Sequence, residues 1–441
     1  MSKIKVILLV IIAFVCQINA QLGAPGEKSG KGIVALKASQ IIDGTGAQPI
    51  KNGVIVVSDN KIIAIGTSAN VKIPDGAKII DLGNTTLLPG FIDAHTHLVG
   101  RVLGDPEGNN SRFRDYDSMG AILGVTHVEK TLLAGFTTIR NLGAGNFDDL
   151  ALRKAINDGW IIGPRMQTAG HSLGITGGHC DENGYKPGAA DGDFKTGIAD
   201  GVEQVRAAVR YQIKYGADVI KTCATGGVLS EGDAVGVTQY GYEELKVMVE
   251  EAEKHERKVA AHAHGTEGIK IAVRAGVASI EHGSFLDEEG AKLMASKGTF
   301  LVPTLMAGET VEKLAKSGVL KGFRGEKALA AAAAMRNAIK IAVANKVKIA
   351  LGTDAGVIQH GTNGHEFTLM VEWGGMRPID AITAGTLNGA KLLGLDKTIG
   401  SLTVGKYADI VAVAGNPLEN IKTMENAVFV MKNGAIYKEM R

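Results

Sequence analysis

Short apolar runs in this chain repeatedly end in side chains that bind metal ions. Segments with helical periodicity separate these runs, and this alternation predicts parallel strands joined by helices. Side chains on strands so far apart in the sequence can meet only if the strands close into a barrel, whose carboxyl ends share one rim. The side chains concerned are His95, His97, Lys221, His262, His282 and Asp354.

Eight strands are predicted in the middle of the chain, and they define the fold class as α/β, a (β/α)8 barrel of the triosephosphate isomerase type. Helices are predicted at residues 242–256, 287–296 and 326–345. An open, doubly wound sheet is the alternative, but no GxGxxG turn follows the first strand. The strands are predicted to end near His97, Asn141, His171, Thr222, His264, His282, Thr304 and Asp354.

The two flanks of the chain have a different sequence pattern, in which short β-type runs are separated by glycine and asparagine turns. Examples are residues 53–58 and 61–66 on one side and 407–413 and 428–434 on the other. We expect the flanks to pair into a small β-sandwich domain. The predicted organisation is a signal peptide (1–20), the N-terminal segment of the sandwich (32–88), the (β/α)8 barrel that carries the metal-binding side chains (89–396) and the C-terminal segment of the sandwich (397–441).

The first twenty residues resemble a secretory signal. Lys3 and Lys5 precede an apolar run over residues 6–16, and Ala20 offers a small residue before Gln21. A membrane anchor is the alternative, but the run is short against the roughly 20 residues that span a bilayer. We therefore predict cleavage near Ala20, no stable membrane span afterwards, and a secreted or periplasmic protein.

Charge excludes some classes of partner. The chain has 48 basic and 46 acidic residues, and loss of Lys3 and Lys5 with the signal would balance them. A neutral chain without a basic run argues against nucleic acid or an anionic membrane as partner. We expect a small-molecule substrate and a homo-oligomer. Beyond the signal, Cys180 and Cys223 are the cysteines present, and a disulfide and two free thiols both remain open.

Histidines two residues apart occur at two predicted strand ends. His95 and His97 close the first strand, and His262 and His264 close the fifth. On a strand, residues i and i+2 point to one face, so each pair of imidazoles converges. One such pair alone also fits ordinary core or surface histidines, but together with His282 the pairs indicate a metal site. Spacing does not choose between His262 and His264 as a ligand.

Lys221 and Asp354 complete this set. Lys221 ends a buried strand, where an unpaired ammonium is costly. A salt bridge is one explanation. The other is a carbamate formed with carbon dioxide, which carries a negative charge and offers two oxygens that can bridge two metal ions. Asp354 can ligate a metal ion and accept a proton from water.

The order of these residues resembles the amidohydrolase superfamily over nearly the whole chain beyond the signal. Three segments resemble its branch of prolidase-like dipeptidases and related amide hydrolases: ITGGHCD at 175–181, IKTCATGG at 220–227 and AHAHG at 261–265. The sister family, imidazolonepropionase, typically uses one metal ion and lacks the bridging lysine, so Lys221 argues against that assignment. Relatives often have glycine where this chain has Cys180.

The resemblance also implies roles for individual residues. His95 and His97 would bind the more buried of two zinc ions, His262 and His282 the second, and carbamylated Lys221 would bridge them. Asp354 would be a ligand and the proton shuttle. His264 would lie beside the metal or contact substrate, His179 would polarise the scissile carbonyl, and Tyr240 would contact substrate. A structural loop histidine and a packed aromatic are the alternatives for His179 and Tyr240.

The function implied is a binuclear zinc amidohydrolase that cleaves dipeptides (Xaa-Pro or related) or N-acyl amino acids by attack of a metal-activated hydroxide. Hydrolysis of a lactone, cyclic amide or other small ester is the nearest alternative, and a non-catalytic metal-binding scaffold is a different class. Two long loops, residues 99–118 and 173–197, are predicted to lie over the site. Arg112 and Arg114 in the first loop could bind a substrate carboxylate or simply be solvated.

Overall fold

The computed structural model describes residues 26–108, 111–230 and 233–439. The predicted signal peptide, residues 1–20, lies outside the described residues. Within the described ranges, no helix has the length and apolar content needed to cross a bilayer.

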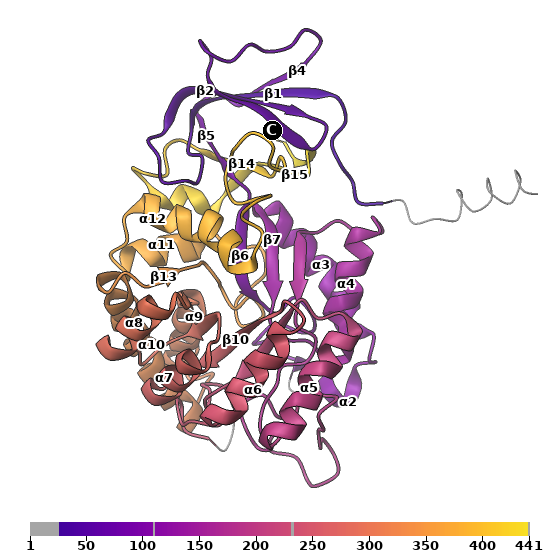
Figure 1. Cartoon of the computed structure of the whole chain (residues 1–441), viewed down its shortest axis with the longest axis vertical. Helices are drawn as coiled ribbons and strands as arrows, with labels where there is room; N and C mark the ends of the chain where they lie inside the picture. Colours follow the sequence, from indigo (N-terminus) through magenta and orange to yellow (C-terminus); the bar gives the residue numbers. More distant parts are fainter. Residues whose placement is uncertain (1–25, 109–110, 231–232, 440–441) are drawn as a thin grey trace, which may run out of the picture.

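Strands from both flanks of the chain form one sheet, which lies at one end of the molecule (Figure 1). Its pairing order is β16-β15-β14-β5-β1-β2-β3, and β4 pairs with β1 off this path. Strand β14 runs antiparallel to β5, with Val411 opposite Leu88, so the two flanks are joined. The strands are β1 (Ile33–Ile41), β2 (Ile50–Ser58), β3 (Lys61–Thr67), β4 (Lys78–Asp81), β5 (Thr85–Pro89), β14 (Ile410–Ala414), β15 (Ala427–Lys432) and β16 (Ala435–Lys438).

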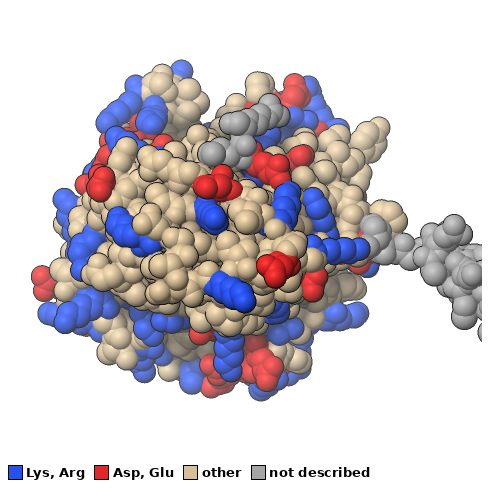
Figure 2. Space-filling model, turned by 90° about the horizontal axis from the view of Figure 1, so that it is seen from above, with Lys and Arg blue, Asp and Glu red and all other residues tan. Residues whose placement is uncertain are grey.

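The hydrogen bonding of this end is that of a single eight-stranded sheet, so it does not show two separate sheets of a sandwich. Figure 2 shows the same end from above, with basic and acidic side chains interspersed over the visible face.

The middle of the chain forms two parallel sheets. The first contains β6 (Phe91–Thr96), β7 (Phe136–Asn141) and β8 (Arg165–Thr168). The second contains β9 (Val219–Cys223), β10 (Lys258–Ala263), β11 (Ser279–His282), β12 (Phe300–Val302) and β13 (Lys348–Ile349). Single parallel bridges join the sheets at both edges, between Thr96 and Ala355 and between Leu173 and Thr222. The arrangement is a mixed α/β fold with all eight predicted strands present.

Helices lie outside these strands (Figure 1) and cover them, so strands such as β6 and β9 are buried along their whole length. The three predicted helices are confirmed, with ends that differ by up to four residues. The helices of this region are α2 (Ser111–Arg114), α3 (Met119–Leu133), α4 (Asp148–Asn157), α5 (Gly201–Tyr215), α6 (Tyr242–Glu253), α7 (Thr266–Ala275), α8 (Glu288–Lys297), α9 (Leu305–Lys316), α10 (Gly322–Ala344), α11 (His365–Glu372), α12 (Pro378–Thr383) and α13 (Gly389–Leu393).

The eighth strand, β13, ends at Ile349, five residues before its predicted limit at Asp354. The chain continues beside β6, where Ala94 N donates to Leu351 O at 2.8 Å. Gly352 permits this close approach, since a Cβ there would lie 2.9 Å from the His95 Cβ. Asp354 then adopts a left-handed φ of 60°, which ends the extended run and turns its side chain toward the histidines.

Candidate metal centre

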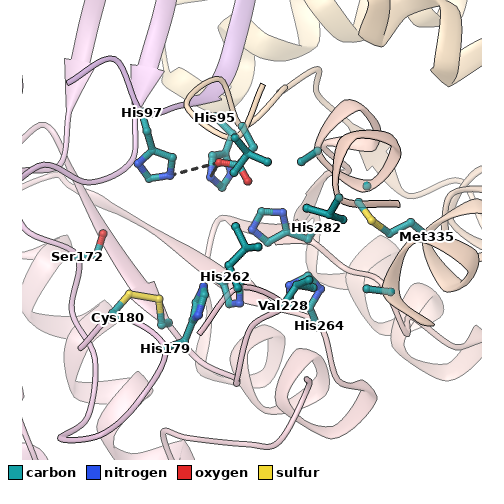
Figure 3. A pocket seen from close by; sticks show the side chains of 18 of the residues that line it. His95, His97, Ser172, His179, Cys180, Val228, His262, His264, His282 and Met335 are labelled. Carbon is teal, nitrogen blue, oxygen red and sulfur yellow. Dashed lines mark ion pairs between the residues drawn. A yellow bond between two sulfur atoms is a disulfide. The ribbon is translucent and has the colours of Figure 1, made fainter. Parts of the chain in front are cut away.

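A cavity of about 200 Å³ opens at the carboxyl ends of the parallel strands. All six side chains singled out in the sequence line it, together with His179 and His264. Figure 3 shows the imidazoles facing one another across this cavity, with Cys180 and His179 on one side and Met335 on the other. The structure therefore brings together residues from strands far apart in the sequence.

One group of possible metal ligands consists of His95, His97 and Asp354. Asp354 Oδ1 lies 3.4 Å from His97 Nε2 and 3.5 Å from His95 Nε2 (dashed line from His97 in Figure 3). The donor atoms of the three side chains all lie within 4.8 Å of one another. This separation suits a single ion placed between them.

A second group consists of His262, His264 and His282, whose donor atoms also lie within 4.8 Å of one another. His262 Nε2 is buried and has no hydrogen-bond partner among the described residues. His264 stacks on His282 with ring centroids 5.0 Å apart. The geometry thus makes His264 as able to ligate an ion as the two histidines that the resemblance selects.

Hydrogen bonds at Nδ1 orient several of these rings. His95 Nδ1 lies 2.9 Å from Glu281 Oε2, His282 Nδ1 2.7 Å from Thr304 Oγ1, and His264 Nδ1 2.6 Å from Ser284 Oγ. A partner at Nδ1 leaves Nε2 as the ligating atom and fixes the direction of its lone pair.

Lys221 lies beside both groups, with its Nζ 3.5 Å from His95 Nε2. Among the residues that the structure describes, no carboxylate lies within ion-pair distance of this Nζ, so the salt-bridge explanation has no support. Burial lowers the pKa of Lys221 to about 8, which raises the fraction of neutral amine.

Burial also sets the protonation of the other groups. It lowers the pKa of His95, His262 and His282 well below the usual range, that of His97 to about 4 and that of His264 to about 3. Burial raises the pKa of Asp354 to about 6. At neutral pH the imidazoles are uncharged donors, which is the form that binds zinc. The donor set and the unpartnered His262 Nε2 therefore fit divalent metal ions.

Below the imidazoles lies a buried ion pair that the sequence analysis missed. Arg140 Nη2 donates to Glu281 Oε1 at 2.9 Å, and Glu281 Oε2 holds His95. Arg140 Nε also donates to Ala94 O at 2.7 Å. The sequence did contain a signal for this pair, because Arg140 and Glu281 are charged residues inside otherwise apolar strands.

Asp93 is a second missed residue, and it ties the end of β6 to the segment before Asp354. Its carboxylate accepts from His95 N at 3.1 Å, Thr353 Oγ1 at 2.6 Å and Asn363 Nδ2 at 2.8 Å. Burial raises the pKa of Asp93 to about 6. Because His95 is a candidate ligand and Thr353 directly precedes Asp354, Asp93 fixes the spacing of these two ligands.

The structure does not bring Tyr240 to the cavity. Its side chain is fully buried, and its hydroxyl donates to Ala199 O at 2.8 Å. The geometry therefore gives it the alternative role of a packed aromatic. Arg114 is exposed and pairs with Glu107 at 3.2 Å, and the side chain of Arg112 lies outside what the structure describes.

The two long loops line an adjoining cavity of about 720 Å³. It shares His97, Ser172 and Cys180 with the cavity that contains the candidate metal ligands. Arg101 from the first loop is occupied by Asp105 and Asp115. Cys180 and Cys223 form a disulfide, which settles the pairing that the sequence left open.

Replacing Glu281 with glutamine is expected to lower the affinity for the bound metal about 10–100-fold, because His95 loses the carboxylate that orients it. The free energy of unfolding should fall by about 3 kcal/mol, since the Arg140 guanidinium is left buried without a counter-charge. Chelator competition and urea unfolding measure the two effects. Glu250→Gln, which removes an exposed ion pair with Lys246, is the matched control and should leave metal affinity unchanged. Equal metal affinity in Glu281→Gln and wild type would contradict this role.

The proteins to which this chain is similar are consistent with a metal-dependent hydrolase site. The model of the amidohydrolase family matches residues 86–437. Ochratoxinase from Aspergillus niger is 36% identical over 436 residues, covering 92% of this chain and 87% of that protein. Imidazolonepropionase from Pseudomonas savastanoi pv. phaseolicola is 26% identical and covers 82% and 88%. A solved structure described as a Xaa-Pro dipeptidase with bound methionine in the active site superposes with a TM-score of 0.86 at 38% identity, covering 92% of this chain and all of that one.

This chain belongs to the amidohydrolase family. It is a hydrolase acting on C–N amide bonds, and its fold matches family structures of the triosephosphate isomerase barrel type.

Proposed function

We propose that this protein is a binuclear zinc amidohydrolase that cleaves dipeptides, Xaa-Pro or related, or N-acyl amino acids. The observation that carries the proposal is the presence of two groups of metal-type donors in one cavity, with Lys221 beside both. Membership of the amidohydrolase family and the similarity to a Xaa-Pro dipeptidase support an amide as the bond cleaved.

His95 and His97 would hold one ion, His262 and His282 the other, and a carbamate on Lys221 would bridge them. Asp354 would ligate the ion held by His95 and His97. When bound, the ions would supply an acidified water and stabilisation of negative charge on the carbonyl oxygen. Two points support the carbamate: no carboxylate of the described residues lies within ion-pair distance of Lys221 Nζ, and an ammonium beside two cations would be repelled.

The chain's own side chains supply the proton transfer. The Asp354 carboxylate would accept the proton of the attacking water and deliver it to the leaving amine nitrogen. His179 has a buried Nδ1 without a partner among the described residues, and we assign it to the scissile carbonyl. His264, held by Ser284, would contact substrate.

The walls of the cavity favour an apolar group on one side of the scissile bond. The apolar residues that line the cavity include Val228, Val311, Ala331 and Met335, all buried. The nearby Lys327 ammonium donates to the carbonyl oxygens of Gly227, Ser230 and Asp233 and pairs with the Asp233 carboxylate, so its hydrogen-bond donors are already engaged. A buried apolar side chain contributes about 1.5–3 kcal/mol of binding.

The finer architecture belongs to the same proposal. We expect the two parallel sheets to form one closed barrel, supported by the bridges at both of their edges. We expect the eight-stranded sheet to fold over itself as a sandwich, supported by a shared core of Leu36, Ile55, Leu87 and Phe429. Secretion or periplasmic location and a homo-oligomeric state stay predictions from the sequence.

The proposal is tested with a library of dipeptides and N-acyl amino acids, assayed for released amine with the zinc-loaded protein. One residue beside the scissile bond is varied in this library. Substrates with leucine, methionine or phenylalanine at this position should be cleaved with kcat/KM at least about tenfold above those with glycine, because the apolar side chain is buried on binding. Aspartate and lysine at that position should be poor. No turnover across both sets would remove the peptidase assignment and leave small lactones and cyclic amides to be assayed.

A further inference from the structure

The Cys180–Cys223 disulfide joins two regions of the candidate metal centre that lie 43 residues apart in sequence. Cys223 is the last residue of β9, two residues after Lys221. Cys180 directly follows His179 in the β8–α5 loop, residues 169–200. Both cysteines line the cavity, and Figure 3 shows the sulfur atoms beside His179.

The same loop is attached to β9 at a second point. Leu173 N donates to Lys221 O, and Cys223 N donates to Leu173 O, both at 2.8 Å. Residues 173–180 are therefore closed onto one strand at both ends, by backbone hydrogen bonds at Leu173 and by the disulfide at Cys180. Gly174 makes the closure possible, because a Cβ there would lie 2.7 Å from the Cys180 Cβ.

This closed segment presents His179 to the cavity. The His179 ring stacks on His262 with centroids 4.2 Å apart. Gly227 permits that position, since a Cβ there would lie 2.2 Å from the His179 Cε1. Among the described residues, His179 N–H donates to Gln239 Oε1 at 3.0 Å, and Asn183 Nδ2 donates to the adjoining Gly178 O at 2.8 Å. Loss of the disulfide would free the end of the segment next to His179.

We propose that the Cys180–Cys223 disulfide is a positioning element that holds His179 over the metal-binding imidazoles, so that turnover depends on the bond and metal binding does not. The proposal rests on the function proposed above for the activity that it modulates. Reduction by a trialkylphosphine breaks the S–S bond, water supplies the two thiol hydrogens and the oxygen, and the phosphine becomes its oxide.

The first test compares oxidised wild type, phosphine-reduced wild type, Cys180→Ala and Cys223→Ala. The last three should bind the same amount of zinc as the oxidised protein and lose about 10–100-fold in kcat/KM, the effect of a small misplacement of a catalytic group. Phosphine should not change Cys180→Ala, which controls for other effects of the reagent. Unchanged kcat/KM in reduced wild type would overturn the proposal.

A double-mutant cycle separates positioning of His179 from general structural support. His179→Ala alone should lower kcat/KM by about 10²–10³, as for loss of a group that stabilises the carbonyl oxygen. Adding Cys180→Ala to His179→Ala should then cost less than about twofold, because the two changes act through one group. Full additivity of the two losses would show that the disulfide does not act through His179.

A readout without substrate keeps the proposal independent of the proposed function. On reduction, the backbone amides of residues 174–181 should exchange hydrogen faster, while those of β9 stay protected. Equal exchange before and after reduction would overturn the proposal. Failure of the oxidised protein to cleave any library member would instead remove the proposed function and leave the exchange result to decide the positioning role.

Discussion

Asp354→Asn is expected to lower kcat by about 10²–10⁴, the range for loss of a general acid–base group, while metal binding persists. Asparagine keeps an oxygen that can ligate an ion near His95 and His97 but cannot accept a proton. In the protein without bound metal, burial raises the pKa of the Asp354 carboxyl to about 6. Steady-state kinetics and metal analysis on the same preparation measure both effects.

Asp117→Asn is the matched control. Asp117 lines the adjoining cavity formed by the two long loops, and it does not line the cavity that contains the candidate metal ligands. It should retain wild-type kcat. An Asp354→Asn protein with full metal content and near wild-type turnover would show that another group moves the proton.

Lys221→Met should remove at least one metal ion per chain and lower kcat/KM by about a thousandfold, since a lost ion costs several kcal/mol of charge stabilisation. Lys221→Arg tests the chemistry of the bridge, because arginine keeps a positive charge but forms no carbamate. The arginine variant should lose as much metal as the methionine variant. Acetate, which offers two carboxylate oxygens, should restore some of the metal binding to Lys221→Ala.

The opposite result for Lys221→Arg would be informative in itself. Full metal content and activity in that variant would mean that position 221 needs only a cation. The carbamate would then be wrong even though the two groups of histidines stood.

Sequence periodicity predicted the strands, and the positions of the strand ends predicted which candidate ligands meet in one cavity, because both depend on local pattern. The side chains of a histidine pair such as His95 and His97 are predicted to point the same way, because alternate residues of a strand share a face. The order of strand ends then placed His262, His282 and Asp354 at one rim. The helices were likewise readable from their apolar spacing.

The features that the sequence did not reveal depend on contacts between distant segments. The partnership of Arg140 with Glu281 requires β7 and β11 to face a common interior, which no local pattern states. The early end of β13 depends on the approach of Gly352 to His95. Tyr240 was assigned by resemblance alone, and its hydroxyl bond to Ala199 could be known only from the folded chain.

On the function proposed here, two metal ions make this cavity a hydrolytic site. The direct measurement is the zinc content per chain of the purified protein, followed by amine release from a cleaved library member after chelator treatment and after zinc return. We predict two zinc ions per chain, loss of turnover on chelation and recovery on zinc return. Absence of stoichiometric metal, with turnover unchanged by chelator, would contradict the account.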